Sequence, residues 1–267
     1  MPFVERPGYR IAWQTVGQGT PVLLIMGAAY SSRMWYPAVP ALSEQHTVIT
    51  FDNRGTGTST ATRRASIADM ADDALAVLDA AGKETAHVYG VSLGGVVALE
   101  LAFRAPDRVR SLTLGCTGIL SAEKPRAPKA LNVFLRVMPR RSMVAATKYG
   151  PACPPERAAA NQEVLRGDAA KRRALVAQQN ALRAYSADPA RVATLGMPAL
   201  VLHGTADPVV PLAWGRELAD ALPDSRMVTY DGAGHNYVAE MGERPNEDVL
   251  NFLSAVDAET VVPDRSA

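Results

Sequence analysis

The stretch "HVYGVSLGGVVALELA", residues 87–102, joins an apolar run typical of a buried strand to a pattern typical of a helix. Ser92 stands at the junction, with Gly90 before it and Gly94 after it. A sharp strand-to-helix turn would expose the serine oxygen, and glycine on each side removes Cβ atoms that would clash in such a turn. The spacing G-x-S-x-G in this context predicts a nucleophilic serine. A tight glycine turn that merely packs a helix on a sheet is the alternative.

Short apolar runs alternate with longer helical patterns on both sides of this stretch. Strands are predicted at residues 21–26, 47–52, 86–90, 108–116, 198–204 and 226–232, and helices near 33–44, 66–81, 95–104, 211–221 and 243–255. Residues 8–19 predict a hairpin-like N-terminal edge. Several strands are continuously apolar, as strands buried on both faces should be. The sequence therefore predicts an α/β fold with a doubly wound, mostly parallel sheet.

The alternation stops after residue 116 and resumes at residue 198. We name residues 119–190 the insertion, and its composition predicts helices near 127–147, 155–166 and 169–186, broken by proline-rich joints. The expected organisation is a core of residues 1–118 and 191–256, interrupted by a helical insertion. The polar tail, residues 257–267, has no periodic face and is expected to be disordered.

The composition is that of an ordinary globular protein, with 267 residues, 48% of them hydrophobic and 21% charged. The first ten residues lack the apolar core of a signal peptide, and no run of about 18 apolar residues is present. The two cysteines are too few for a disulfide framework and have no metal-ligand spacing. We therefore expect a cytoplasmic protein with no membrane association, no metal and no cofactor.

The net charge of +1 conceals an asymmetry, because the insertion holds 13 Lys and Arg against 5 Asp and Glu. A solvated helical face is the simplest interpretation of this excess. An anionic small-molecule substrate, or one attached to an acidic carrier protein, is the functional interpretation. Nucleic acid is disfavoured because few aromatic residues are interleaved with the basic ones. The sequence gives no indication of the oligomeric state.

Two further stretches supply the groups that would activate a serine hydroxyl. "LVLHGTADPVVP" (residues 200–211) places Asp207 in a turn after one strand, and "YDGAGHNYV" (residues 230–238) places His235 after the next. The order Ser92, Asp207, His235 is the one expected for hydrolases built on this kind of sheet. In that arrangement His235 accepts the hydroxyl proton and Asp207 holds the imidazole tautomer.

Other histidines and carboxylates compete for these roles. His203 lies inside an apolar strand and His46 and His87 start strands, so all three are expected to be structural. Asp231 lies close to His235 but precedes a glycine turn, and it remains the alternative acid.

An oxyanion formed during acyl transfer needs two preorganised donors, usually backbone N–H groups. Leu93, directly after the serine, is expected to supply one, and Ala28, in the loop after the strand at 21–26, the other. Gly27 would let this loop approach the serine closely. The residues expected to line the substrate pocket are Gly27, Tyr30, Trp35 and Asn236, although aromatic residues after a strand are often core.

Four segments together resemble the α/β-hydrolase superfamily, and within it the branch that contains 3-oxoadipate enol-lactonase. They are "LLIMGAAYSSRMW" (23–35), "VITFDNRGTGTS" (48–59), "MADDALAVLDA" (70–80) and "AHVYGVSLGGVVALELA" (86–102), and the resemblance extends from about residue 9 to residue 255. It implies Ser92 as nucleophile, Asp207 as acid, His235 as base, and the amides of Leu93 and Ala28 as oxyanion donors. The insertion would be a helical cap over the pocket.

The resemblance implies a serine esterase or lactonase that works through an acyl-enzyme. Met26 replaces the histidine that many relatives have before the glycine of the oxyanion loop, so hydrogen bonding there is expected to differ. Asp52, Arg54 and Gly55 match a segment that shapes the neighbouring loop. The same triad could serve a thioesterase, acyltransferase, perhydrolase, C–C hydrolase or cyclase, and a protein that only binds small molecules remains the non-enzymatic alternative.

Overall fold

The computed structural model describes residues 1–62, 64–123, 149–168 and 172–260. Within these ranges one sheet contains β1 (Phe3–Arg6), β2 (Tyr9–Val16), β3 (Thr20–Ile25), β4 (His46–Phe51), β5 (Ala86–Val91), β6 (Val109–Gly115), β7 (Ala199–Gly204) and β8 (Ser225–Tyr230). The strand order is β1-β2-β4-β3-β5-β6-β7-β8. The first two strands pair antiparallel and the other six are parallel, which confirms the predicted fold class.

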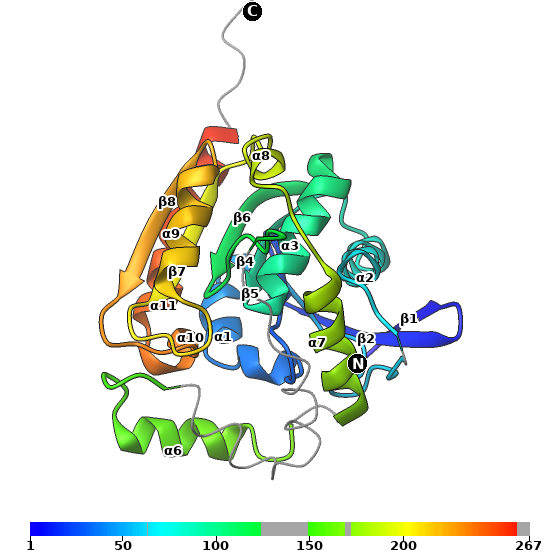
Figure 1. Ribbon diagram of the computed structural model, residues 1–267. Coiled ribbons are helices and arrows are strands. Elements are labelled where there is room, and N and C mark those ends of the chain that lie inside the picture. The colour runs from blue at the N-terminus through cyan, green and yellow to red at the C-terminus, as the bar shows by residue number, and fades with distance from the viewer. Residues whose placement is uncertain (63, 124–148, 169–171, 261–267) are drawn as a thin grey trace, which may run out of the picture.

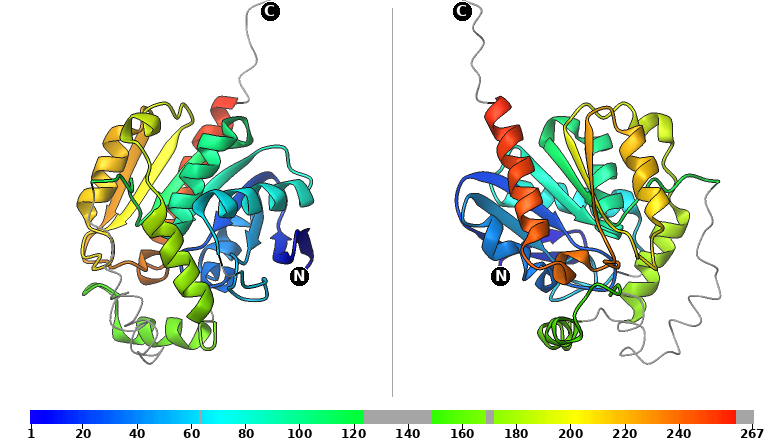
Figure 2. Two further views of the ribbon diagram at one scale, coloured as in Figure 1. Left: turned by 45° about the vertical axis from the view of Figure 1, so that its right-hand side comes forward. Right: turned by 90° about the vertical axis from the view of Figure 1, so that its left-hand side faces the viewer.

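Helices cover both faces of this sheet (Figures 1 and 2). The helices of the core are η1 (Ser32–Trp35), α1 (Ala38–Leu42), α2 (Ile67–Ala80), α3 (Leu93–Arg104), η2 (Pro106–Arg108), α9 (Leu212–Ala221), α10 (Tyr237–Glu240) and α11 (Arg244–Thr260). The described part of the insertion contains α6 (Pro155–Val164), α7 (Arg172–Ala184) and the start of α8 (Pro189–Val192). Helices α2, α3 and α9 lie on one face, and α1 and α11 on the other. No helix in the described ranges is long and apolar enough to cross a bilayer.

The sheet separates two hydrophobic cores, and β3 shows how one strand serves both. Leu23 and Ile25 pack toward α2 and α3, whereas Val22 and Leu24 pack toward α1 and α11. Side chains alternate between the faces of a strand, so a strand that is covered on both faces must be apolar at every position. Complete burial of each such side chain contributes about 1.5–3 kcal/mol, and the central strands thereby hold the loops at their carboxyl ends in fixed positions.

The loop after β4 is held in place by the side chains of Asp52 and Arg54. Asp52 accepts hydrogen bonds from the backbone N–H of Ser32 at 2.9 Å and of Thr58 at 2.9 Å, and so links this loop to the one after β3. The guanidinium of Arg54 forms a buried ion pair with Asp73 on α2. Asp52 and Arg54 thus have the structural role that the sequence indicates.

The structure corrects two boundaries. The tail was expected to begin at residue 257, but α11 continues to Thr260, because Asp257 accepts hydrogen bonds from Arg110 at 2.8 Å and lies 3.0 Å from a ring nitrogen of His87. The N-terminal hairpin begins earlier than residues 8–19 suggest, since β2 pairs with β1 from residue 3 onward. The expected helix at 127–147 and residues 261–267 lie outside the described residues.

Candidate active site

Ser92 lies where β5 ends and α3 begins, as the G-x-S-x-G pattern predicts. Its backbone has a φ of 56° and a ψ of −120°, a conformation that residues with a side chain rarely adopt. The Ser92 N–H donates to the carbonyl oxygen of Gly115 at 2.8 Å, and Thr117 Oγ1 donates to the Ser92 carbonyl oxygen at 3.0 Å. Two residues at the end of β6 therefore hold the strained serine in place.

The glycines of this turn allow three elements to approach one another closely. A Cβ atom at Gly94 would collide with the carbonyl oxygen of Ile25 on β3, and one at Gly90 would collide with the carbonyl oxygen of Gly94. Neither neighbour can move, because both belong to the backbone of packed elements. Glycine at these positions lets α3 begin directly above β3 and β5.

His235 and Asp207 are joined by a hydrogen bond. Asp207 follows β7 and His235 follows β8, and Nδ1 of His235 lies 2.8 Å from Oδ2 of Asp207. The Asp207 side chain is fully buried, and the other carboxylate oxygen accepts the backbone N–H groups of Val209 at 2.7 Å and Val210 at 3.0 Å. The two loops are also linked through their backbones, because Ala206 N–H donates to the carbonyl oxygen of Ala233 at 2.9 Å.

Electrostatics favour the ionised form of this carboxyl group. Burial opposes ionisation of Asp207, but the hydrogen bond and charge of His235, together with the two backbone amides, hold the pKa of Asp207 below its usual range. An ionised carboxylate can only accept hydrogen bonds. Nδ1 of His235 must therefore be the donor, which leaves Nε2 of the neutral imidazole free to accept a proton.

Ser92 and the His235–Asp207 pair both lie beside the end of β6, Ser92 through its bond to Gly115 and the pair next to Cys116. Cys116 follows Gly115 there, and its Sγ, a carboxylate oxygen of Asp207 and a ring nitrogen of His235 all lie within 4.8 Å of one another. The described residues contain no hydrogen bond between Ser92 Oγ and His235. Catalytic hydrogen bonds often form or tighten only when substrate binds, so the absence of this bond is compatible with a triad.

The same three side chains could in principle hold a thiophilic metal ion. Burial raises the pKa of the Cys116 thiol well above its ordinary value, as does the nearby Asp207, so the metal-binding thiolate is disfavoured. A metal would also have to break the hydrogen bond between His235 and Asp207. The arrangement fits a hydrogen-bonded acid–base pair better than a metal centre.

Residues 27–32 form the loop after β3, which we name the Gly27 loop. A Cβ atom at Gly27 would lie 3.2 Å from the Cβ of Ser92 and 3.8 Å from its Oγ, so the absence of a side chain brings this backbone beside the serine. The N–H of Ala29 donates to Gln178 Oε1 at 3.0 Å, whereas the N–H of Ala28 has no acceptor among the described residues. Ala28 and Leu93, the first residue of α3, therefore present N–H groups that a ligand could use.

Neighbouring segments hold the Gly27 loop from both sides. Asn53 Nδ2 donates to the carbonyl oxygen of Met26 at 2.7 Å, which is the local hydrogen bond at the position where many relatives have histidine. From the insertion, the carboxylate of Asp168 accepts the backbone N–H of Ser31 at 3.1 Å and also its hydroxyl. Neither Asp168 nor Gln178 belongs to a motif, and sequence reasoning missed both.

The pocket residues expected from the sequence have different environments. Trp35 is 0% exposed and packs against Tyr89 in the core with ring centroids 4.7 Å apart, and its place in the pocket stays a prediction. Tyr30 is 6% exposed, and burial raises the pKa of its hydroxyl. Asn236 lies beside His235, and its backbone N–H donates to Glu240 Oε1 at 3.1 Å.

The competing titratable residues have hydrogen-bond partners of their own, although Nε2 of His203 also lies 3.5 Å from Oδ2 of Asp207. His203 is fully buried and donates from Nε2 to the carbonyl oxygen of Val210 at 3.0 Å, which braces the turn that carries Asp207. His87 is bonded at both ring nitrogens. Asp231 is exposed and accepts a hydrogen bond from Thr205 Oγ1 at 3.2 Å, so its contacts do not support the role of acid.

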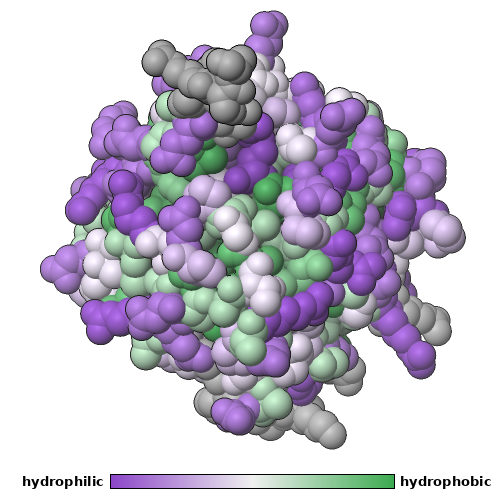
Figure 3. All heavy atoms as spheres, turned by 90° about the horizontal axis from the view of Figure 1, so that it is seen from above, coloured by the Kyte–Doolittle hydropathy of each residue, from purple (hydrophilic) through white to green (hydrophobic). Residues whose placement is uncertain are grey.

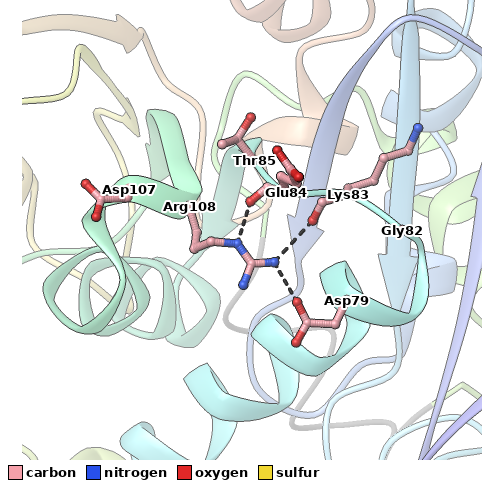
Figure 4. Close-up of a pocket in the computed structure, with 7 residues that line it drawn as sticks. All are labelled: Asp79, Gly82, Lys83, Glu84, Thr85, Asp107 and Arg108. Atoms are coloured by element: carbon pink, nitrogen blue, oxygen red, sulfur yellow. Dashed lines mark hydrogen bonds and ion pairs between the residues drawn. The ribbon is translucent and has the colours of Figure 1, made fainter.

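A surface hollow of about 660 Å³ lies at the amino ends of β5 and β6, whereas Ser92 follows the carboxyl end of β5 (Figure 4). Its lining comes from residues just before β5 and β6: Asp79, Gly82, Lys83, Glu84, Thr85, Asp107 and Arg108. Arg108 turns its guanidinium inward, where it is bonded to the Asp79 carboxylate and to the carbonyl oxygens of Lys83 and Glu84. Viewed toward the upper side of the molecule in Figure 1, the surface carries many hydrophilic side chains with hydrophobic ones between them (Figure 3). The hollow beside Arg108 is remote from Ser92, because the length of β5 separates them.

A parallel sheet with a strained serine after a central strand is the architecture of α/β-hydrolases. Residues 20–143 match the family model described as alpha/beta hydrolase fold, and residues 182–260 match the one described as TAP-like protein. The chain belongs to the α/β-hydrolase superfamily.

Relatives of known sequence or structure extend this result over the whole chain. A protein of Azorhizobium caulinodans named as a carbamate hydrolase, RutD, is 32% identical over 96% of this chain and 100% of its own. The enol-lactonase of Burkholderia xenovorans LB400 superposes with a TM-score of 0.84 at 25% identity, covering 95% of this chain and 100% of that one. A thermophilic esterase of Thermogutta terrifontis gives a TM-score of 0.84 at 25% identity, covering 95% and 97%.

Proposed function

We propose that the protein is a serine hydrolase that cleaves a carboxylic ester or lactone through an acyl-enzyme on Ser92. The hydrogen bond between His235 Nδ1 and Asp207 Oδ2 carries the proposal, because it fixes the tautomer that a general base needs. The strained position of Ser92 and the two N–H groups beside it add the nucleophile and the oxyanion donors. The esterase and the enol-lactonase among the similar structures support the substrate class.

In the proposed reaction His235 Nε2 takes the hydroxyl proton while Ser92 Oγ bonds to the substrate carbonyl carbon. The carbonyl oxygen becomes an oxyanion and is stabilised by the N–H groups of Ala28 and Leu93. Collapse of this intermediate breaks the ester bond, and the imidazolium returns its proton to the leaving alkoxide. Water then attacks the acyl-enzyme with His235 again as base, which releases the acid and restores Ser92.

A carbamate is the second candidate substrate, favoured by the relative named as a carbamate hydrolase at 32% identity over its full length. The same steps would then pass through a carbamoyl group on Ser92. Carbamates are less electrophilic than esters, so the two candidates differ in how much they demand of the oxyanion donors.

The excess of 13 basic over 5 acidic residues in the insertion supports an anionic substrate, free or attached to an acidic carrier. A negatively charged group remote from the reacting carbonyl would be attracted toward the insertion. In the lactone case this group would be a carboxylate on a substituent of the lactone ring.

Labelling with a fluorophosphonate tests the proposal. We expect rapid modification of the wild type at Ser92, none in Ser92→Ala, and turnover of at least one class in a panel of p-nitrophenyl esters, lactones, thioesters and aryl carbamates. Preference for carbamates within the panel would favour the second candidate. A folded wild type that is neither labelled nor active on any class would overturn the proposal and point to a small-molecule-binding protein.

A further inference from the structure

The last residue of α10, Glu240, has a buried carboxylate that accepts hydrogen bonds from three backbone N–H groups. The side chain belongs to a residue that is 1% exposed. Oε2 accepts from Gly234 at 2.8 Å and from Gly150 at 2.9 Å, and Oε1 accepts from Asn236 at 3.1 Å. One carboxylate therefore joins two segments of chain that are far apart in sequence.

Two of these amides flank His235 directly. Gly234 precedes the histidine and Asn236 follows it, so the Glu240 carboxylate holds the backbone on both sides of the imidazole. The fold of α10 makes this possible, because the N–H of Glu240 itself donates to the carbonyl oxygen of Asn236 at 3.1 Å. The single helical turn thus brings the side chain back over the residues at its own start.

The third amide belongs to the insertion. Gly150 lies so close to the loop of residues 231–236 that a Cβ atom there would collide with the carbonyl oxygen of Gly232 and the nitrogen of Gly234. Ala152 N–H donates to the same Gly232 carbonyl oxygen at 3.0 Å. The insertion is therefore docked on the loop that carries His235, with Glu240 between them.

The electrostatic setting shows that these bonds matter. Burial raises the pKa of Glu240 and the nearby Asp207 carboxylate raises it further, whereas each of the three amides opposes this effect. Loss of these donors would leave a buried carboxylate unsatisfied, which is unfavourable. The contact can thus hold a loop in one position.

We propose that Glu240 is a positioning residue, which fixes the His235 imidazole and couples its placement to the docking of the insertion at Gly150. The kinetic part of this proposal rests on the proposed hydrolase function. Glu240 does not touch the reacting atoms, and its effect passes through the backbone at Gly234 and Asn236.

Glu240→Gln is the main test, with Asp231→Asn as the matched control. The carboxamide keeps the size of the side chain, but its NH₂ group faces at least one backbone N–H and cannot accept from it. We expect kcat to fall about ten- to a hundredfold with KM within about twofold, since a small misplacement of a catalytic group has this cost. Asp231 lies in the same loop, is exposed and contacts Thr205 instead, so its variant should keep wild-type values.

A second readout does not depend on catalysis. The proton on His235 Nδ1 that is shared with Asp207 should give a low-field NMR resonance, assigned by its loss in His235→Gln. We expect this resonance to shift or broaden in Glu240→Gln, whether or not the wild type hydrolyses any substrate. If the wild type is neither labelled nor active, the proposed function is refuted. The NMR resonance still tests the positioning role of Glu240 in that case.

A third variant guards against loss of folding in Glu240→Gln. Gly150→Ala forces the insertion away from Gly234 without altering the carboxylate, and we expect it to lower kcat and shift the same resonance. An unchanged resonance in a folded Glu240→Gln or Gly150→Ala protein would overturn the proposal. A fall in kcat without any change in the resonance would do the same.

Discussion

Gln178 accepts a hydrogen bond from the backbone N–H of Ala29 at 3.0 Å, although 149 positions separate the two residues in the chain. Ala29 has a φ of 76°, a left-handed conformation that costs alanine roughly 1–2 kcal/mol. Nε2 of the same carboxamide donates to the carbonyl oxygen of Arg54 at 3.4 Å. A side chain of α7 in the insertion thus stabilises the unfavourable turn that presents the Ala28 N–H.

Replacing Gln178 by methionine should lower kcat about tenfold, because the side chain keeps its length but the acceptor for Ala29 is lost and the Ala28 donor is less well placed. Steady-state kinetics on the best substrate of the panel would measure this. Gln179→Met is the control on the same helix, at a half-buried position, and should retain wild-type kcat. Equal values for both variants would contradict a role for the carboxamide.

Asp207→Asn should lower kcat by a factor on the order of 10⁴. Val209 and Val210 donate to Oδ1, so the carboxamide oxygen of asparagine is expected there and the NH₂ group would face His235 Nδ1. His235 would then have to accept at Nδ1 and carry its proton on Nε2, where it could no longer remove one from Ser92. Near-wild-type turnover would show that another carboxylate serves as the acid.

Ser92→Gly should be more stable than Ser92→Ala by about 1 kcal/mol, with both variants inactive. Glycine adopts a φ of 56° without the clash that a Cβ atom causes. We expect the free energy gained from this relief of strain to exceed the entropic cost of ordering glycine, which is the more flexible residue in the unfolded chain. Urea unfolding of the two variants at one temperature would give the difference. Equal stability would mean that the turn stores little strain.

Stability should rise between about pH 4 and pH 6.5, in part because of His87. Burial lowers the pKa of His87 to about 4, so in this range the unfolded chain binds a proton that the folded protein does not. The free energy of unfolding contributed by His87 is fully present above pH 6.5 and is lost as the pH falls toward 4, up to about 3 kcal/mol at 1.36 kcal/mol per pH unit. Urea titrations at pH 4.5 and 7 should show a smaller difference for His87→Gln than for wild type.

Matched neutral and anionic esters test the charge of the substrate. If the basic excess of the insertion attracts a carboxylate, kcat/KM for the anionic ester should be about tenfold higher at low salt, and the ratio should shrink toward one as ionic strength rises. Equal kcat/KM values for the two esters at both ionic strengths would mean that the basic residues of the insertion form only a solvated face.

The sequence predicts those parts of the molecule whose signal is local. Ser92, Asp207 and His235 each follow an apolar run within a few residues of glycine or proline, so the residue and its turn can be recognised together. The strands were found within one or two residues for the same reason, because burial on both faces imposes an uninterrupted apolar run. The structure joins His235 to Asp207, while the role of the three residues in catalysis stays a prediction.

Contacts between distant segments have no such signal. Asp168 bonds to Ser31 across 137 positions, and its own neighbours in sequence are those of an ordinary helix end. Glu240 could have been noticed, since an acidic residue at the end of the apolar run "YVAE" must find a buried partner. The polar tail was misjudged at residues 257–260 because Asp257 finds its partners, Arg110 and His87, on other elements.

The described part of the insertion is bonded to the core near Ser92 and His235: Gly150 bonds to Glu240, Asp168 to Ser31 and Gln178 to Ala29. Grafting a relative's insertion onto this core would break all three links at once. A chimaera would need both halves of every contact to be transplanted. We therefore expect that exchanging the insertion to change selectivity would also lower activity.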